Sequence, residues 1–129
     1  MILLDTHVLV WSNTDPSRLS REARRLMEKA RRQDGLAISA ISLWELALLL
    51  SRGRIQSYGS IEFSVRRFSE GFTVNPITEE ISALAAQFPD DYPKDPVDRI
   101  IGATARAEGL TLITQDEGIL SSPLLKTVG

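Results

Sequence analysis

The sequence predicts an α/β fold with a mainly parallel central sheet flanked by helices on both faces. The chain begins with three large aliphatic residues, Ile2, Leu3 and Leu4, without polar alternation, which is typical of a strand buried on both faces. Short apolar runs of this kind then alternate with longer segments of helical periodicity. That order is expected of strand–helix–strand units in a parallel sheet.

Five strands and six helices are predicted in chain order. The strands cover residues 2–4, 36–38, 73–77, 110–114 and 125–128, and the helices cover residues 8–12, 21–33, 43–50, 61–72, 79–88 and 96–108. Ser20, Ser60, Thr78 and Asp95 each precede a helical pattern and are predicted N-caps. The helix after Ser60 is expected to turn Ile61, Val65, Phe68 and Phe72 inward.

The helix over residues 43–50 is apolar nearly all the way round. Because a small domain rarely buries a whole helix, one side of it is expected to contact another chain. The alternative is a helix in the centre of the core.

The composition suits one ordinary globular domain, residues 1–129. Hydrophobic residues make up 43% and charged residues 25%, which argues against disorder. No apolar run could cross a bilayer and no basic region precedes the first one, so no membrane segment or signal peptide is expected and a cytoplasmic location follows. The absence of cysteine and the single histidine, His7, exclude thiolate and multi-histidine metal sites. The net charge of -2 means that a nucleic-acid partner would require a local basic patch or metal ions.

Four acids occupy comparable positions along the chain. Asp5 and Asp116 follow predicted strands, and Glu45 and Asp98 lie near the starts of predicted helices. In open α/β sheets, ligand chemistry gathers beyond the carboxyl ends of the strands, so the four side chains are expected to converge on one cleft.

Each acid also has a purely structural explanation. Asp5 can cap the helix that follows it, and Ser42 with Glu45 matches a capping box. Asp98 is an acid in the first turn of a helix, and Asp116 can be a turn residue. The residues alone leave these alternatives open.

Converging carboxylates would repel one another, and a divalent cation would relieve that repulsion. Oxygen ligands select a hard ion, Mg²⁺ or Mn²⁺. Such an ion can activate a water and neutralise a leaving oxygen, so the chemistry indicated is hydrolysis of a phosphodiester bond.

Four segments then resemble the motifs of the PIN domain family. They are LDTHVLVW at residues 4–11, ISAISLWEL at 38–46, DPVDRIIGATA at 95–105 and LITQD at 112–116. They are most similar to the VapC-like branch, the toxin ribonucleases of bacterial and archaeal toxin–antitoxin pairs. The resemblance covers essentially the whole chain and implies a single PIN-like domain with Mg²⁺- or Mn²⁺-dependent endoribonuclease activity.

The resemblance also implies roles for particular residues. Asp5 and Asp98 would be the direct metal ligands, while Glu45 and Asp116 would bind a second ion or orient water. Thr114 would position an acid or a water.

The resemblance implies partners as well as an RNA substrate. They are a second copy of the chain, in a homodimer, and a small antitoxin whose tail enters the cleft. Asp95 belongs to the third motif but is expected to cap a helix at the edge of the site, and Val97 stands where the family often has an aromatic residue.

Two other functions remain as alternatives. The first is a catalytically silent PIN-like module that binds protein or RNA. The second is a phosphatase with Asp5 as nucleophile, which usually requires an acid two residues later, where this chain has His7.

Several further residues have two interpretations each. His7 is expected to be satisfied locally, with substrate contact as the alternative. Arg99 could bind phosphate or pair with an acid, and the arginine-rich stretch over residues 18–32 could be a solvated helix face or a phosphate-binding one. Trp11 and Trp44 are expected to anchor the core or an interface rather than to stack on bases.

Overall fold

The computed structural model describes residues 1–129 and has the predicted α/β architecture. Its five strands form one fully parallel sheet in the order β3-β2-β1-β4-β5. The strands are β1 (Ile2–Leu4), β2 (Leu36–Ser39), β3 (Thr73–Asn75), β4 (Thr111–Ile113) and β5 (Thr127–Val128). All five correspond to predicted strands, so the strand count and the parallel arrangement are confirmed.

Seven α-helices and one short 3-10 helix connect the strands. They are α1 (Thr6–Thr14), η1 (Pro16–Arg18), α2 (Arg21–Arg32), α3 (Ala40–Ser51), α4 (Ile61–Ser69), α5 (Glu79–Gln87), α6 (Pro96–Glu108) and α7 (Glu117–Leu120). The predicted N-caps Ser20, Ser60, Thr78 and Asp95 all accept bonds from helix N–H groups. The short helix α7 was not predicted, and no helix is long and apolar enough to span a bilayer.

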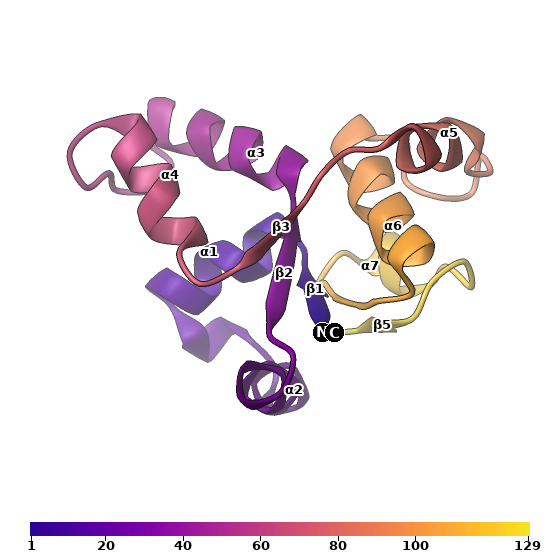
Figure 1. Cartoon of the computed structure of the whole chain (residues 1–129), viewed down its shortest axis with the longest axis horizontal. Helices are drawn as coiled ribbons and strands as arrows, with labels where there is room; N and C mark the ends of the chain where they lie inside the picture. The colour runs from indigo at the N-terminus through magenta and orange to yellow at the C-terminus, as the bar shows by residue number, and fades with distance from the viewer.

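The strands separate two apolar cores, because successive side chains point to opposite faces. Leu4 and its neighbours in register, Ile38 and Ile113, face α1 to α4. Leu3 and its neighbours, Ala37 and Leu112, face α5 to α7. Figure 1 shows these helices as two groups on either side of the strands. Both faces of β1 are therefore covered, as its unbroken apolar run predicts.

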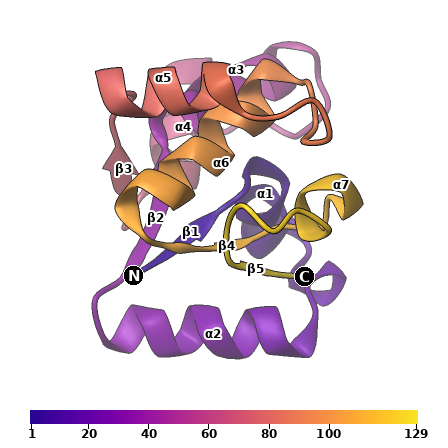
Figure 2. The ribbon, with the colours of Figure 1, turned by 90° about the vertical axis from the view of Figure 1, so that its right-hand side faces the viewer.

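The two ends of the chain are held at opposite ends of helix α2. The Met1 amino group pairs with Asp34, just after α2, and the Ser20 hydroxyl before α2 donates to the carbonyl of Gly129 at 2.5 Å. Figure 2 shows α2 running beneath the strands with both termini beside it.

The strand order reverses direction at β1. The chain proceeds from β1 to β2 and β3 on one side, then crosses to β4 and β5 on the other. Ligand sites in open parallel sheets lie beyond the carboxyl ends of the strands at such a reversal. In this chain those ends lead into Asp5 after β1 and Thr114 after β4.

Two sequence-based interpretations are wrong in detail. Helix α3 starts at Ala40 with Ser39 as its N-cap, so Ser42 and Glu45 lie within the helix and do not form a capping box. Ile61 is 41% exposed, whereas Phe68 of the same helix is buried. Ile61 shares the helical face of Phe68, but as the first residue of α4 it lies at the exposed end of that face.

A close contact supports the start of α6, which carries Asp98. The hydroxyl of buried Tyr92 donates to the carbonyl oxygen of Asp98 at 3.2 Å. The Tyr92 ring lies against Gly102, where a Cβ atom would stand 2.1 Å from the hydroxyl oxygen. Glycine at position 102 therefore makes room for the tyrosine.

Replacing Gly102 by alanine should destabilise the fold. Overpacking of this kind costs about 1–3 kcal/mol. We expect urea denaturation of Gly102→Ala to give a lower free energy of unfolding than wild type, and Gly102→Ala/Tyr92→Phe to recover part of the loss because the nearest atom is gone. An equally stable Gly102→Ala protein would contradict this packing.

Candidate active site

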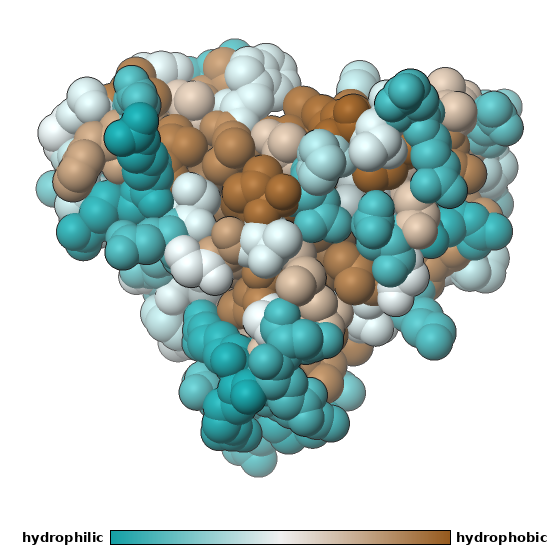
Figure 3. Space-filling view, in the orientation of Figure 1, coloured by the Kyte–Doolittle hydropathy of each residue, from teal (hydrophilic) through white to brown (hydrophobic).

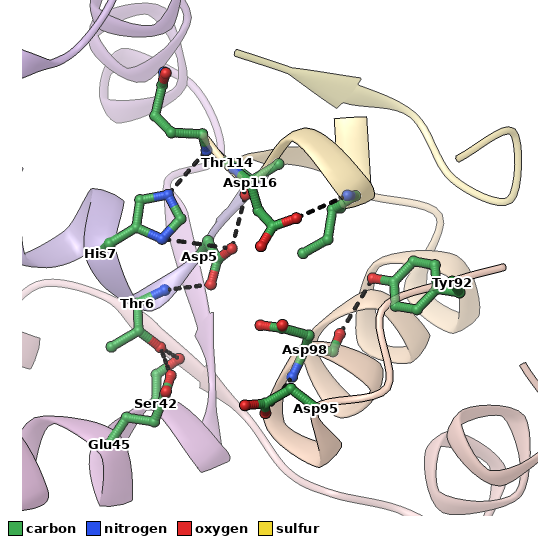
Figure 4. Close-up of polar contacts among 12 residues, drawn as sticks. Asp5, Thr6, His7, Ser42, Glu45, Tyr92, Asp95, Asp98, Thr114 and Asp116 are labelled. Atoms are coloured by element: carbon green, nitrogen blue, oxygen red, sulfur yellow. Dashed lines mark hydrogen bonds and ion pairs between the residues drawn. The ribbon is translucent and has the colours of Figure 1, made fainter. Parts of the chain in front are cut away.

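Asp5 is held at the carboxyl end of β1 by bonds to both of its carboxylate oxygens. One oxygen accepts from the Thr6 N–H at 2.8 Å, and the other accepts from the Thr114 hydroxyl at 2.7 Å. The contact with Thr114 follows from strand register, because Leu4 is paired with Ile113. Asp5 is only 4% exposed, so its orientation is fixed. Asp5 caps α1 and also faces the gap beyond the sheet (Figure 4), so it is both a helix cap and a member of the acidic cluster.

Thr114 connects Asp5 with Asp116. Its hydroxyl also accepts from the Asp116 N–H at 3.1 Å. The Asp116 carboxylate then accepts from the Ile119 N–H at 3.0 Å and caps α7. One buried hydroxyl thus sets the relative positions of two of the predicted acids.

Glu45 reaches the same region from α3. Its carboxylate accepts from the Thr6 hydroxyl, which also lies 2.9 Å from the Ser42 hydroxyl. Burial raises the pKa of Glu45, and the negative charges of Asp5 and Asp95 raise it further, while the Thr6 bond opposes the rise. Glu45 is therefore close enough to the other carboxylates to be repelled by them.

Asp98 lies in the first turn of α6, opposite Asp5. Its backbone N–H faces the carboxylate of the N-cap Asp95 at 3.4 Å, and its side chain points into the gap (Figure 4). Burial raises the pKa of Asp98 to about 7. The neighbouring carboxylates add to the rise, in the order Asp5, Asp95, Asp116 and Glu45. The charges of the other three predicted acids thus all act on Asp98.

The protein supplies little positive charge to balance these acids. None of its ion pairs involves Glu45, Asp98 or Asp116. The nearest cationic candidate is His7, whose Nδ1 lies 3.7 Å from Asp5. Its Nε2 accepts from the Gln115 N–H at 2.9 Å, so that nitrogen carries no proton. His7 was expected to be satisfied locally, but its hydrogen-bond partner Gln115 lies 108 positions away in the sequence, and the bond braces the 114–116 segment.

Arg99 does not face the acids or a free phosphate-binding surface. Its guanidinium donates to the carbonyl of Phe88 at 2.8 Å and to that of Pro89 at 3.1 Å, with longer bonds to Ala85 and Tyr92. Both expectations for Arg99 are wrong, because carbonyls at the end of α5 and in the loop after it bind its donors instead.

Sequence reasoning missed Thr6, Ser42 and Tyr92. Thr6 of α1 contacts Ser42 and Glu45 of α3 and orients the Glu45 carboxylate. No local sequence pattern predicts a contact between two helices that are so far apart in the chain. Tyr92 had an indirect signal: a glycine inside a helical pattern, Gly102, often marks a close packing contact.

The four acids do not form a ready-made metal cage. No group of three or more aspartate, glutamate or histidine side chains is close enough to hold an ion together. The structure brings the predicted acids to one gap, and their roles as ligands remain predictions.

A model of the PIN domain matches residues 2–122. The chain belongs to the PIN domain family. It is 38% identical to Ribonuclease VapC22 of Mycobacterium tuberculosis over 120 residues, which are 93% of this chain and 90% of the relative. The resemblance to this family is therefore confirmed.

Two solved structures share the PIN fold of this chain. VapBC2 from Rickettsia felis, bound to a DNA fragment from its promoter, aligns with a TM-score of 0.75 and 18% identity over 99% of this chain and 98% of that one. A toxin–antitoxin complex from Klebsiella pneumoniae aligns with a TM-score of 0.71 and 23% identity over 100% and 97%.

Without divalent cations, Asp98 should make the PIN domain less stable as the pH rises. Its folded pKa of about 7 lies above the ordinary 3.8, so the folded state holds more protons than the unfolded state between these values. Stability is then lost as the pH rises through this window. We expect Asp98→Asn to melt above wild type at about pH 8 in chelator, with a smaller difference at about pH 5.

The control for this measurement is Asp91→Asn, which removes an acid from the exposed loop before α6. Its melting temperature should follow that of wild type at every pH. A wild-type protein that melts above Asp98→Asn at the higher pH would contradict the raised pKa.

Proposed function

We propose that this PIN domain protein is a divalent-metal-dependent endoribonuclease that acts as the toxin of a toxin–antitoxin pair. The observation that carries the proposal is the convergence of carboxylates from four separate segments at the sheet reversal, without protein cations to balance them. The 38% identity to Ribonuclease VapC22 supports RNA as the substrate.

The donor set fits Mg²⁺ or Mn²⁺. Every predicted ligand is a carboxylate, which hard cations prefer, and no thiol is present. Mg²⁺ is usually held by one or two carboxylates together with waters and phosphate oxygens, so it does not require a cage of three side chains. We assign Asp5 and Asp98 as its direct ligands, and Glu45 and Asp116 to a second ion or to a water.

Each residue of the site has a distinct task in this proposal. A bound ion would supply charge neutralisation and a more acidic water. Asp5, immobilised by Thr114, fixes one side of the gap. Asp98 points into the gap from the other side and would hold the ion opposite Asp5. Glu45 and Asp116 orient water for in-line attack on the phosphodiester.

The toxin assignment brings an expected partner and location. The structural relative from Klebsiella pneumoniae is a toxin–antitoxin complex by name, which supports a small cognate antitoxin for this chain. An antitoxin tail that enters the acidic gap would block the substrate. Toxin and RNA would meet in the cytoplasm.

A homodimer is the second expected assembly. Trp44 of α3 is 54% exposed, and Val74 and Ile77 on the β3 segment are 39% and 41% exposed. Figure 3 shows an apolar band where β3 passes between the two helical groups, rimmed by hydrophilic residues. Apolar surface of this kind often marks a protein interface. We propose that a second copy of the chain covers the Trp44 side of α3.

Cleavage of RNA tests the proposed activity. In Mg²⁺ or Mn²⁺, Asp5→Asn and Asp98→Asn should each lower kcat/KM by more than the roughly 10–100-fold that loss of an outer-shell partner costs. Asp91→Asn is the matched control and should cleave like wild type, and chelation should stop cleavage. Full activity in both site variants would refute the assigned ligands.

The catalytically silent alternative makes a different prediction for the same protein. A silent module would leave RNA intact and would show no Mn²⁺ binding by calorimetry at millimolar metal.

Sedimentation of wild type and Trp44→Glu tests the homodimer. Wild type should sediment at twice the 14.3 kDa chain mass, whereas a charge at the centre of the interface should give monomers. Phe63→Glu, at an exposed aromatic residue on α4, is the control and should remain dimeric. A monomeric wild type, or a dimeric Trp44→Glu, would count against this interface.

A further inference from the structure

A groove lined by arginines and aromatic rings lies beside the acidic gap. It has a volume of about 540 Å³ and runs between the end of α1 and the segment that joins α3 to α4. Its principal lining residues are Trp11, Arg18, Arg54, Ile55 and Tyr58, and we call it the arginine groove. An adjoining cavity shares Tyr58 and adds Arg67, and we include it in the arginine groove. The proposed cleavage reaction assigns no role to any of these residues.

A stack of side chains connects the arginine groove with the acidic gap. The guanidinium carbon of Arg18 lies 4.1 Å from the centre of the Trp11 ring. The Trp11 ring centre lies 5.0 Å from that of His7, and His7 is next to Asp5. Trp11 follows Asp5 by six residues, which corresponds to about 9 Å along a helix. The arginine groove is therefore close to the site of the proposed reaction.

Arg67 and Tyr58 repeat this arrangement at the other end of the arginine groove. The Arg67 guanidinium lies 5.1 Å from the Tyr58 ring centre, and the ring also packs near Phe68 at 6.2 Å. The Tyr58 N–H donates to the buried Ser64 hydroxyl at 2.7 Å, which fixes the loop. Tyr58 nevertheless remains 48% exposed. A rigid, open aromatic ring with an arginine over it is suited to stacking and to phosphate contact.

The arginines of the groove are not paired with acidic side chains. Arg18, Arg54 and Arg67 take part in none of the protein's ion pairs, and Glu70 at the margin pairs with none of them. By contrast, Arg31 and Arg66, outside the groove, pair with glutamates of their own helices. A chain of net charge -2 thus has a local basic surface beside its acidic gap.

We propose that the arginine groove binds the single-stranded RNA that flanks the scissile phosphate. Arginines held against aromatic rings can bind phosphates with their free N–H edges and stack on unpaired bases. Double-stranded RNA hides its base faces and offers no such stacking. The groove thereby holds the strand so that the adjacent phosphate enters the acidic gap. This assignment rests on the proposed ribonuclease function.

Binding of RNA in chelator tests the arginine groove without cleavage. The probe is a fluorescent single-stranded RNA of roughly ten nucleotides, a length within the usual range of such sites. Arg18→Ala and Arg67→Ala should each weaken binding at least about fivefold, the lower limit for loss of a stacking contact. Each should also lower the slope of log affinity against log salt by about 0.7. Arg18→Lys should recover the salt slope but only part of the affinity, because lysine lacks the planar group.

Arg25→Ala is the matched control, because it removes the same charge from the exposed face of α2. It should change RNA affinity less than twofold. Equal losses in Arg25→Ala and the groove variants, or an equal loss for duplex RNA, would overturn the proposal. Unchanged RNA affinity in both groove variants would overturn it as well and would favour a protein as the occupant.

The result of the RNA-binding test can be distinguished from the result of the RNA-cleavage test. If wild type does not cleave RNA in Mg²⁺ but Arg18→Ala and Arg67→Ala still bind it more weakly, the groove stands and the proposed reaction fails. If wild type cleaves RNA while the groove variants bind it normally, the groove alone fails.

Discussion

Repulsion between like charges is the constraint around which this PIN domain is built. Asp5, Glu45, Asp98 and Asp116 reach one gap, where neighbouring negative charges raise the free energy of ionising Asp98 and Glu45. Three helix starts offset part of this cost. Asp5, Asp95 and Asp116 cap α1, α6 and α7, where free N–H groups and the helix dipoles favour negative charge. Helix capping and the gathering of acids are thus two aspects of one arrangement.

The positive charges of the protein are held away from this gap. Arg99 is close to it in sequence, yet its donors are bound to carbonyls at the end of α5. Arg18 and Arg67 lie against aromatic rings in the arginine groove. A guanidinium among the carboxylates would neutralise them and lower their affinity for a cation. The acids and the arginines therefore occupy two separate surfaces, which are the proposed sites for a metal ion and for a phosphate backbone.

Where sequence-based interpretation failed, a distant contact outweighed a local pattern. Ser42 and Glu45 have the spacing of a capping box, but Ser39 ends the strand in register and caps α3 first. Both side chains are then turned toward Thr6 instead. No nearby residue in the sequence indicates a partner for Arg99. In the structure its guanidinium donates to backbone carbonyls of the segment over residues 88–92. Local spacing carries no information about either neighbour.

The sequence by itself determined the α/β class, the parallel strands and the strand-end positions of Asp5 and Asp116. Unbroken apolar runs require burial on both faces, and that requirement can be read locally. Only the tertiary structure decided that Asp98 and Glu45 lie near Asp5 and that Thr114 orients Asp5. It also decided that the Arg18 guanidinium lies over the Trp11 ring. These contacts depend on strand order and register, which join residues up to 109 positions apart. The first strand therefore sets the position of Asp5, and the folded sheet supplies its neighbours.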